Sequence, residues 1–230
     1  TLYAILNEIK SPSKNIVTVE DPVEYKLDGI NQVQIKPDIG LTFAAALRSF
    51  LRQDPDVMLV GEVRDLETAQ ICIRSALTGH LVLSTVHTND APSAVTRLAD
   101  MGIETYMIAP SLLMVVAQRL VRKLCPECKE AYEPSPEQIQ DFKLSAGLIY
   151  RAKGCAKCNQ IGYKGRLCIS EILVVNEEIR ELINQRASFQ KIREAARANG
   201  MLTLYDSVMR KVEDGTTSLE EALSVTIGVE

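Results

Sequence analysis

Four of the six cysteines form two Cys-x-x-Cys pairs, Cys125–Cys128 and Cys155–Cys158. Two such pairs can supply four thiolates to a tetrahedral ion, and Zn²⁺ is the metal that suits this ligand set. The loop between the pairs is longer than the roughly 15–20 residues of the usual pattern, but closure entropy grows slowly with loop length. We expect a closed structural zinc site, with a redox dithiol or free thiols as the alternative. The other two cysteines, Cys72 and Cys168, lie in apolar segments and are expected in the core.

Carboxylates follow two short apolar runs that have the composition of buried strands: Glu20, Asp21 and Glu24 follow residues 16–19, and Glu62 follows residues 57–60. Ligands of open α/β sheets bind just outside the carboxyl ends of the strands, and an acid there can hold Mg²⁺ in a nucleotidase. Gly61 would let the backbone approach a ligand closely. The alternatives are a solvated acidic turn for the first motif and a surface ion pair between Glu62 and Arg64 for the second.

The two histidines, His80 and His87, flank a third apolar run at residues 81–85. A single histidine is usually structural, but two that flank a strand beside two acidic strand ends favour a functional site. An imidazole there could sense a γ-phosphate through a hydrogen bond. Zinc ligation by the histidines is less favoured, because the four cysteines already complete a ligand set.

The elements that position these residues alternate in type along the chain. The three apolar runs lack alternation with charged residues, which is typical of strands buried on both faces of a parallel sheet. Thr42, Asp65 and Asp90 are expected N-caps of the helices between and after them. Residues 111–124 are expected to be helical and residues 167–175 to form a strand. Helices capped by Asn176, Ser188 and a Ser218 capping box should follow, so the pattern predicts an α/β layer fold.

Composition excludes several classes of protein. The chain has 230 residues, of which 46% are hydrophobic and 24% charged, so it can bury a sizeable core. A net charge of -4 and an aromatic content of 5% argue against non-specific nucleic-acid binding. No apolar run approaches the roughly 18–20 residues that span a bilayer, and no signal peptide opens the sequence. We therefore expect a cytoplasmic protein without nucleic-acid partners and without direct membrane insertion.

Together these motifs resemble one family, the motor ATPases of the secretion superfamily. The segment TVEDPVEY at 18–25 is similar to the family's Asp box, and RQDPDVMLVGEVRD at 52–65 is similar to its atypical Walker B motif. The segment TGHLVLSTVHTN at 78–89 resembles the His box, and the cysteine pairs resemble the tetracysteine element. This last element favours the type II secretion and type IV pilus extension ATPases over the pilus-retraction relatives, which lack it.

The resemblance implies a RecA-like, mostly parallel sheet with flanking helices, a small tetracysteine zinc lobe and a C-terminal helical bundle. It divides the chain into a motor domain at 1–124, a zinc-binding lobe at 125–158, and the strand and helical bundle at 159–230. No G-x-x-x-x-G-K-[ST] motif occurs, and residues 1–6 resemble the helix that follows a P-loop. We therefore expect a C-terminal portion that lacks the phosphate cradle and has little activity by itself.

The resemblance also assigns roles to the candidate residues. Glu24 would orient or deprotonate the attacking water, and Glu62 would hold Mg²⁺ through water. The remaining site residues would support them: Glu20 and Asp21 in the acidic cluster, Arg64 as the partner of an acid nearby or across an interface, and His80 and His87 in coupling phosphate occupancy to neighbouring subunits.

The function implied is that of a homohexameric ATPase that uses Mg²⁺ and ATP to power type II secretion or type IV pilus assembly. Its partners would be inner-membrane secretion or pilus platform proteins, which would place it peripherally at that membrane. One alternative is a zinc-ribbon interaction module on a non-catalytic α/β scaffold. Another is a metal-dependent hydrolase that uses the acidic cluster, although it leaves the cysteine pairs unexplained.

Overall fold

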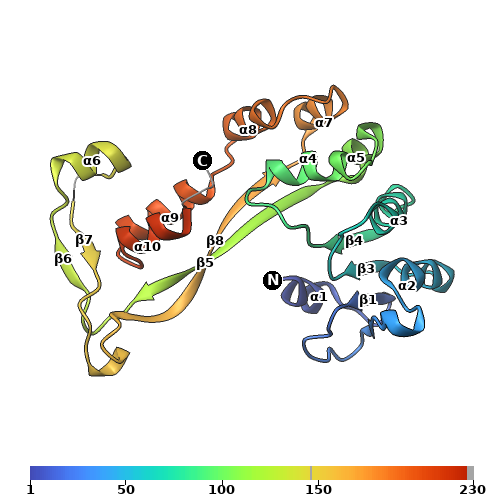
Figure 1. The fold of residues 1–230 in the computed structure, drawn as a ribbon, viewed down its shortest axis with the longest axis horizontal. Coiled ribbons are helices and arrows are strands. Elements are labelled where there is room, and N and C mark those ends of the chain that lie inside the picture. The colour runs from blue at the N-terminus through green and yellow to red at the C-terminus, as the bar shows by residue number, and fades with distance from the viewer. Residues whose placement is uncertain (146, 227–230) are drawn as a thin grey trace. The chain divides into compact units, whose positions relative to one another are not determined.

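The computed structural model describes residues 1–145 and 147–226. The chain forms two compact units from segments that alternate along the sequence (Figure 1). Unit 1 comprises Thr1–Thr88, Pro92–Leu113 and Val175–Ile192, and unit 2 comprises Asn89–Ala91, Met114–Val174 and Arg193–Glu230. The division at residues 124 and 158 stays a prediction.

Unit 1 contains a parallel four-stranded sheet, which confirms the α/β class. Its strand order is β2 (Asn31–Gln34), β1 (Ile16–Glu20), β3 (Val57–Val60) and β4 (Leu81–Ser84). All three predicted strands are present, and β1 and β3 are fully buried as expected. The expectation was wrong for β4, which is partly exposed because it lies at the edge of this sheet. Strand β2 was not predicted, because its sequence NQVQ carries little apolar signal.

Helices precede and follow these strands along the chain, and α2, α3 and α7 begin at predicted capping residues. They are α1 (Leu2–Ile9), α2 (Phe43–Phe50), α3 (Leu66–Leu77), α4 (Pro92–Asp100), α5 (Thr105–Ser111) and α7 (Glu177–Asn184), with 3₁₀ turns η1 (Pro37–Ile39) and η2 (Leu51–Gln53). The side chains of Thr42, Asp65 and Asn176 accept the N–H groups that open α2, α3 and α7. Helix α8 (Phe189–Ala198) begins in unit 1 and ends in unit 2.

One face of β1 points toward α1. The strand period of two puts Ile16, Thr18 and Glu20 on the same face, and Leu6 of α1 is buried in one cluster with Ile16. Val57 and Leu59 of β3 complete that cluster. Helix α1 therefore covers the face of the sheet on which the carboxylate of Glu20 lies.

Unit 2 is built on a long antiparallel ribbon, β5 (Met114–Leu124) paired with β8 (Tyr163–Val174). The predicted strand at 167–175 is confirmed, but the helix predicted at 111–124 is wrong. The valines at 115, 116 and 121 favour a strand, and the partner strand lies far away in sequence. Tertiary pairing therefore decides between two local conformations that the sequence leaves close in energy.

The inner face of the ribbon packs against α9 (Leu204–Glu213) and α10 (Leu219–Thr226). Val121 and Ile169 of the ribbon share a buried cluster with Val208 and Val212 of α9. Strand alternation places Cys168, next to Ile169, on the opposite and exposed face. The core position expected for Cys168 is therefore wrong, whereas Cys72 in α3 is buried as expected.

The segment between β5 and β8 forms a small lobe. It contains β6 (Glu130–Tyr132) paired with β7 (Ile149–Arg151), then the 3₁₀ turn η3 (Ala156–Cys158). Among its described residues is the α-helix α6 (Pro136–Phe142), which begins at the predicted capping box of Ser135 and Gln138. At Ser218 the box is only half formed, because Glu221 donates its N–H to Ser218 Oγ while its carboxylate binds Arg122.

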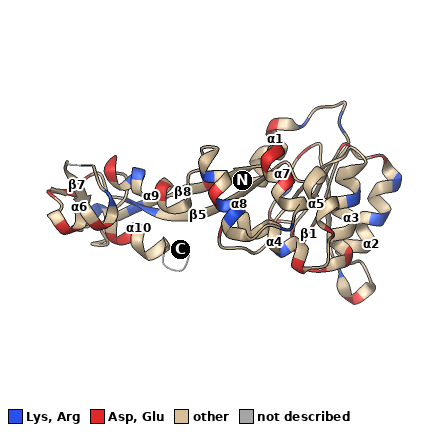
Figure 2. Cartoon of the chain, turned by 90° about the horizontal axis from the view of Figure 1, so that it is seen from above, with Lys and Arg blue, Asp and Glu red and all other residues tan. Residues whose placement is uncertain are grey.

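Basic and acidic residues are interspersed over the helices of both units (Figure 2). Mixed charge of this kind is typical of helix faces that meet solvent. Among the described residues, no helix is long and apolar enough to cross a membrane.

Candidate functional site

The carboxyl ends of β1, β3 and β4 lie at the same edge of the sheet, because the three strands are parallel and adjacent. The structure brings Glu62, Arg64 and His87 together at this edge. Arg64 Nε lies 2.6 Å and His87 Nε2 3.2 Å from Glu62 Oε2. The side chain of Glu62 is only 12% exposed, whereas those of Arg64 and His87 are 69% and 80% exposed. A sheltered carboxylate is thus held by two groups that solvent and ligands can reach.

The electrostatics of this trio keep Glu62 ionised. Partial burial raises the pKa of its carboxyl, but hydrogen bonds from Arg64 and His87 outweigh burial and hold the pKa below its usual value. A carboxylate in this state can orient a cation or water without competing for a proton near neutral pH.

Two side-chain hydrogen bonds and a close backbone contact at Gly61 join the carboxyl ends of β1, β3 and β4. Ser84 Oγ donates to the Val60 carbonyl at 2.8 Å, and Thr85 Oγ1 donates to the Gly61 carbonyl at 2.7 Å. A Cβ on Gly61 would lie 3.3 Å from Glu20 Cα. The space beside Gly61 is therefore filled by β1, whereas the sequence suggested close approach to a ligand.

The carboxylate of Glu20 is buried beneath α1. Thr18 Oγ1 donates to Glu20 Oε1 at 2.5 Å, Gln32 Nε2 donates to the same oxygen at 3.3 Å, and Tyr3 Oη donates to Oε2. Burial, together with the bond to Glu20, raises the pKa of Tyr3 to about 12, so the phenol stays a donor. Sequence reasoning missed Tyr3 and Gln32, because only tertiary contact reveals their carboxylate partner.

Asp21 and Glu24 lie in the loop that follows β1, and both are exposed. The backbone N–H of Glu24 donates to Tyr3 Oη at 3.3 Å, and the N–H of Leu27 donates to Gln32 Oε1 at 2.6 Å. The backbone of the loop is thus tied to the Glu20 cluster while the carboxylates of Asp21 and Glu24 meet solvent.

The two histidines lie at opposite ends of β4. His87 follows the strand and joins Glu62, whereas His80 immediately precedes it. His80 Nδ1 lies 3.0 Å from the Ser75 carbonyl at the end of α3. A carbonyl only accepts, so Nδ1 carries the proton. The structure therefore does not bring His80 to the carboxyl edge.

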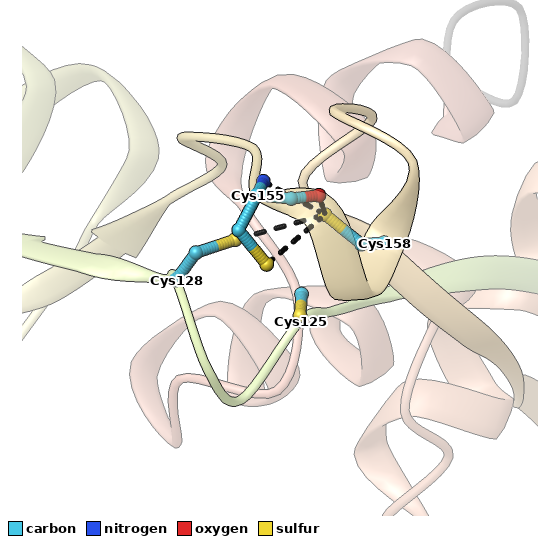
Figure 3. Close-up of side chains that lie close together, drawn as sticks. All are labelled: Cys125, Cys128, Cys155 and Cys158. Carbon is cyan, nitrogen blue, oxygen red and sulfur yellow. Dashed lines mark hydrogen bonds between the residues drawn. The ribbon is translucent and has the colours of Figure 1, made fainter.

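The four predicted cysteines meet in unit 2, where their sulfur atoms gather between two loops (Figure 3). All four lie within 4.8 Å of one another, and the Cys128–Cys158 and Cys155–Cys158 Sγ distances are both 3.8 Å. A tetrahedral ion with metal–sulfur bonds of about 2.3 Å requires sulfur atoms about 3.8 Å apart. The donor set and its spacing therefore fit a tetrahedral metal ion.

Backbone groups favour a thiolate at Cys158. The N–H groups of Cys155 and Gly162 each donate to Cys158 Sγ at 3.2 Å. Burial raises the pKa of Cys158, but these bonds outweigh it and lower the pKa to about 6. The turn geometry needs glycine, since Gly154 has φ +101° and a Cβ there would lie 2.6 Å from the Gln160 carbonyl oxygen.

Comparisons with known proteins identify the family of this chain. The chain is 54% identical over 229 residues to the type II secretion system ATPase E of Vibrio cholerae, covering 98% of this chain and 45% of the relative. It is 50% identical over 232 residues to the type IV pilus assembly ATPase PilB of Thermus thermophilus, covering 99% of this chain and 26% of that relative. The chain thus spans less than half the length of these relatives.

The fold is also similar to a solved structure, that of the pilus retraction motor PilT with bound ADP. The TM-score is 0.73 at 29% sequence identity, over 98% of this chain and 56% of that one. The family model described as "Type II/IV secretion system protein" matches residues 1–224. Because this model matches nearly the whole chain, the chain belongs to the type II/IV secretion system protein family.

Proposed function

We propose that this chain is part of an ATPase that powers type II protein secretion or type IV pilus assembly. The observation that carries the proposal is the ionised Glu62, held by Arg64 and His87 at the carboxyl edge of a parallel sheet. Nucleotides bind at that edge in α/β folds, and the named relatives are ATPases. The chain holds no G-x-x-x-x-G-K-[ST] motif, so the proposal assigns the phosphate-binding loop to residues outside it and expects little turnover from the chain alone.

Glu62 is suited to hold water on a magnesium ion. Carboxylate oxygens are the ligands that Mg²⁺ prefers. Arg64 and His87 both bind Oε2 of Glu62, so within the described part of the chain Oε1 is left to accept from a metal-bound water. The ion would neutralise charge on the phosphates when it arrives with ATP.

Glu24 is the residue that we propose orients or deprotonates the attacking water. Its carboxylate is exposed while its backbone is tied to the Glu20 cluster, so the loop is held and the acid is free to meet substrate. Phosphoryl transfer depends mainly on positioning and charge. Glu20 supports the loop from beneath, and Asp21 adds negative charge beside it.

The basic residues of the site would report phosphate occupancy. Arg64 and His87 are exposed and share one carboxylate, so a phosphate oxygen could draw either side chain away from Glu62. His80 would carry that change from the other end of β4 to the end of α3, which it contacts. We propose that this movement reaches neighbouring subunits of a homohexamer.

We propose that the cysteine cluster holds structural Zn²⁺. Four thiolates at tetrahedral spacing leave no open position for catalysis, so the lobe would serve stability or contact with an inner-membrane platform protein. Such contacts would place the motor peripherally on the cytoplasmic side of that membrane. The competing function is a non-catalytic interaction module with the same zinc lobe.

The test is a chimeric motor in which this chain replaces the matching residues of the Vibrio cholerae relative. Steady-state ATP hydrolysis should fall by at least a hundredfold in Glu62→Gln and in Glu24→Gln, with nucleotide binding retained. Glu8→Gln, which changes an exposed carboxylate of α1, is the matched control and should keep full turnover. Unchanged hydrolysis in both site variants would refute the assignment, whereas a chimera that binds its partners but hydrolyses no ATP would favour the interaction module.

A further inference from the structure

The side chains of Tyr3 and Gln32 meet between α1, β1 and β2, beside the acidic loop at residues 20–27. We infer that Tyr3 and Gln32 are positioning residues that hold the backbone of this loop, and with it Glu24, in the geometry that turnover requires. This inference rests on the role proposed for Glu24.

The hydroxyl of Tyr3 joins three parts of the site. It donates to the buried Glu20 carboxylate and accepts both the Glu24 N–H and Gln32 Nε2, each at 3.3 Å. One donation and two acceptances use the full capacity of a phenol oxygen. The ring also packs edge-on against Tyr25 of the loop, with centroids 4.7 Å apart. Helix α1 is therefore connected to the loop at two points, the buried carboxylate of Glu20 and the backbone N–H of Glu24.

The amide of Gln32 holds the far end of the loop. Its Oε1 accepts the Leu27 N–H at 2.6 Å, which identifies the oxygen and turns Nε2 toward the site. The two hydrogens on Nε2 are then shared among Glu20 Oε1 at 3.3 Å, Tyr3 Oη at 3.3 Å and the Tyr25 carbonyl at 3.2 Å. Gln32 thus ties the loop to β2 at two backbone positions.

These contacts do more than fill space. Phenylalanine at position 3 would occupy nearly the same volume, yet it would remove a donor from a carboxylate that is 4% exposed. A buried carboxylate without its donors is costly, so Glu20 would turn or draw in water and shift the loop. Asp21, Glu24 and Tyr25 are exposed, so packing alone does little to fix that part of the loop.

The first experiment measures amide hydrogen exchange on the chain itself. Gln32→Ala should speed exchange of the Leu27 amide by at least tenfold, because that amide loses its acceptor, Gln32 Oε1. Tyr3→Phe should do the same to the Glu24 amide, which loses Tyr3 Oη. The matched controls Gln190→Ala and Tyr106→Phe change exposed residues of α8 and α5 and should leave both amides unchanged. Unchanged exchange at these amides in folded site variants would overturn the inference.

The second experiment measures ATP hydrolysis in the chimeric motor. Misplacing a reacting group by about 1 Å can cost about a hundredfold, so both variants should lower kcat by about 10–100-fold and leave KM for ATP within about twofold. A loss confined to KM would overturn the inference, as would full kcat in a motor that Glu24→Gln inactivates. If Glu24→Gln itself keeps full turnover, the proposed role of Glu24 fails first, and hydrogen exchange then still decides whether the loop is held as described.

Discussion

Removing the metal proposed for the cysteine site should loosen unit 2 well beyond the loops that carry the cysteines. Leu144 and Ile149 of the lobe are buried in the same cluster as Val208 and Val212 of α9. Lys129, next to Cys128, donates to the Gly215 carbonyl between α9 and α10 at 2.9 Å. Because the lobe shares this core, its loss of order should reach α9 and α10.

The size of the effect follows from linkage between binding and folding. A ligand that binds only the folded state stabilises it by about 4.1 kcal/mol when its free concentration is about 1,000 times its Kd. For a domain of roughly 60–100 residues, 1 kcal/mol shifts Tm by about 4–8 °C. Unit 2 is of roughly that size, so chelation should lower its Tm by about 15–30 °C. Unit 1 has a core of its own around Leu6 and Ile16 and should keep its stability.

The assay combines metal analysis with hydrogen exchange and thermal melts before and after a zinc-selective chelator. One equivalent of zinc should be bound, and peptides from 125–158, α9 and α10 should lose protection while those from β1 and β3 keep it. Cys158→Ser should reproduce the effect. Cys168→Ser, which changes the exposed cysteine of β8, should not.

Two results would refute this reasoning. If the protein contained no metal and its Tm did not change with chelator, unit 2 would be shown to fold without an ion at the cysteines. Loss of protection confined to 125–158 would show that the shared core does not carry the coupling.

Three further changes test the charged groups. Glu62→Gln should lower the free energy of unfolding by less than about 1 kcal/mol, because the partners of Glu62 are largely exposed. The folded pKa of Glu62 is lowered, so its stabilisation is complete above the ordinary pKa of about 4.3 and is lost as the pH falls through the folded pKa. The melting temperatures of wild type and variant should therefore converge only in acid. Arg122→Ala removes the guanidinium that binds the buried Glu221 at 2.6 and 2.8 Å, and it should lower the free energy of unfolding in urea by about 1–3 kcal/mol. The control Arg166→Ala changes an exposed residue and should lower it by less than about 0.5 kcal/mol. Equal losses in the two variants would contradict the role of the Arg122–Glu221 pair. Burial raises the pKa of Glu171, so the stability of the wild type should decline as the pH rises from about 4.3 through the raised pKa. The stability of Glu171→Gln lacks this pH dependence. The difference in stability between wild type and variant should therefore narrow with rising pH, and a widening difference would contradict the assignment.

Much of the carboxyl-edge site could be predicted before the structure was known. Three β-branched runs indicated parallel strands, and such strands end at one edge, so acids and a histidine that follow them must gather there. The meeting of Glu62, Arg64 and His87 fits that expectation. His80 does not, because a residue before a strand lies at the opposite edge.

The cysteine cluster was the most local of the predictions. Each Cys-x-x-Cys pair brings two thiols together within one turn. The tertiary fold therefore had to determine only that these two turns lie side by side. Cys168 shows the limit of the same reasoning: an apolar neighbourhood in sequence did not reveal which face of a two-stranded ribbon would be covered.

By itself, the sequence determined the class of fold, the strands β1 and β3, the capped helices, the pairing of the four clustered cysteines and the acids at the sheet edge. Each of these depends on period, capping or spacing within a short stretch of chain. Only the tertiary structure decided that residues 114–124 form a strand, that Cys168 is exposed, and that Tyr3 and Gln32 hold the acidic loop. These features depend on partners far away in sequence, and the free energy of such contacts outweighs the small differences in local preference that a sequence pattern reports.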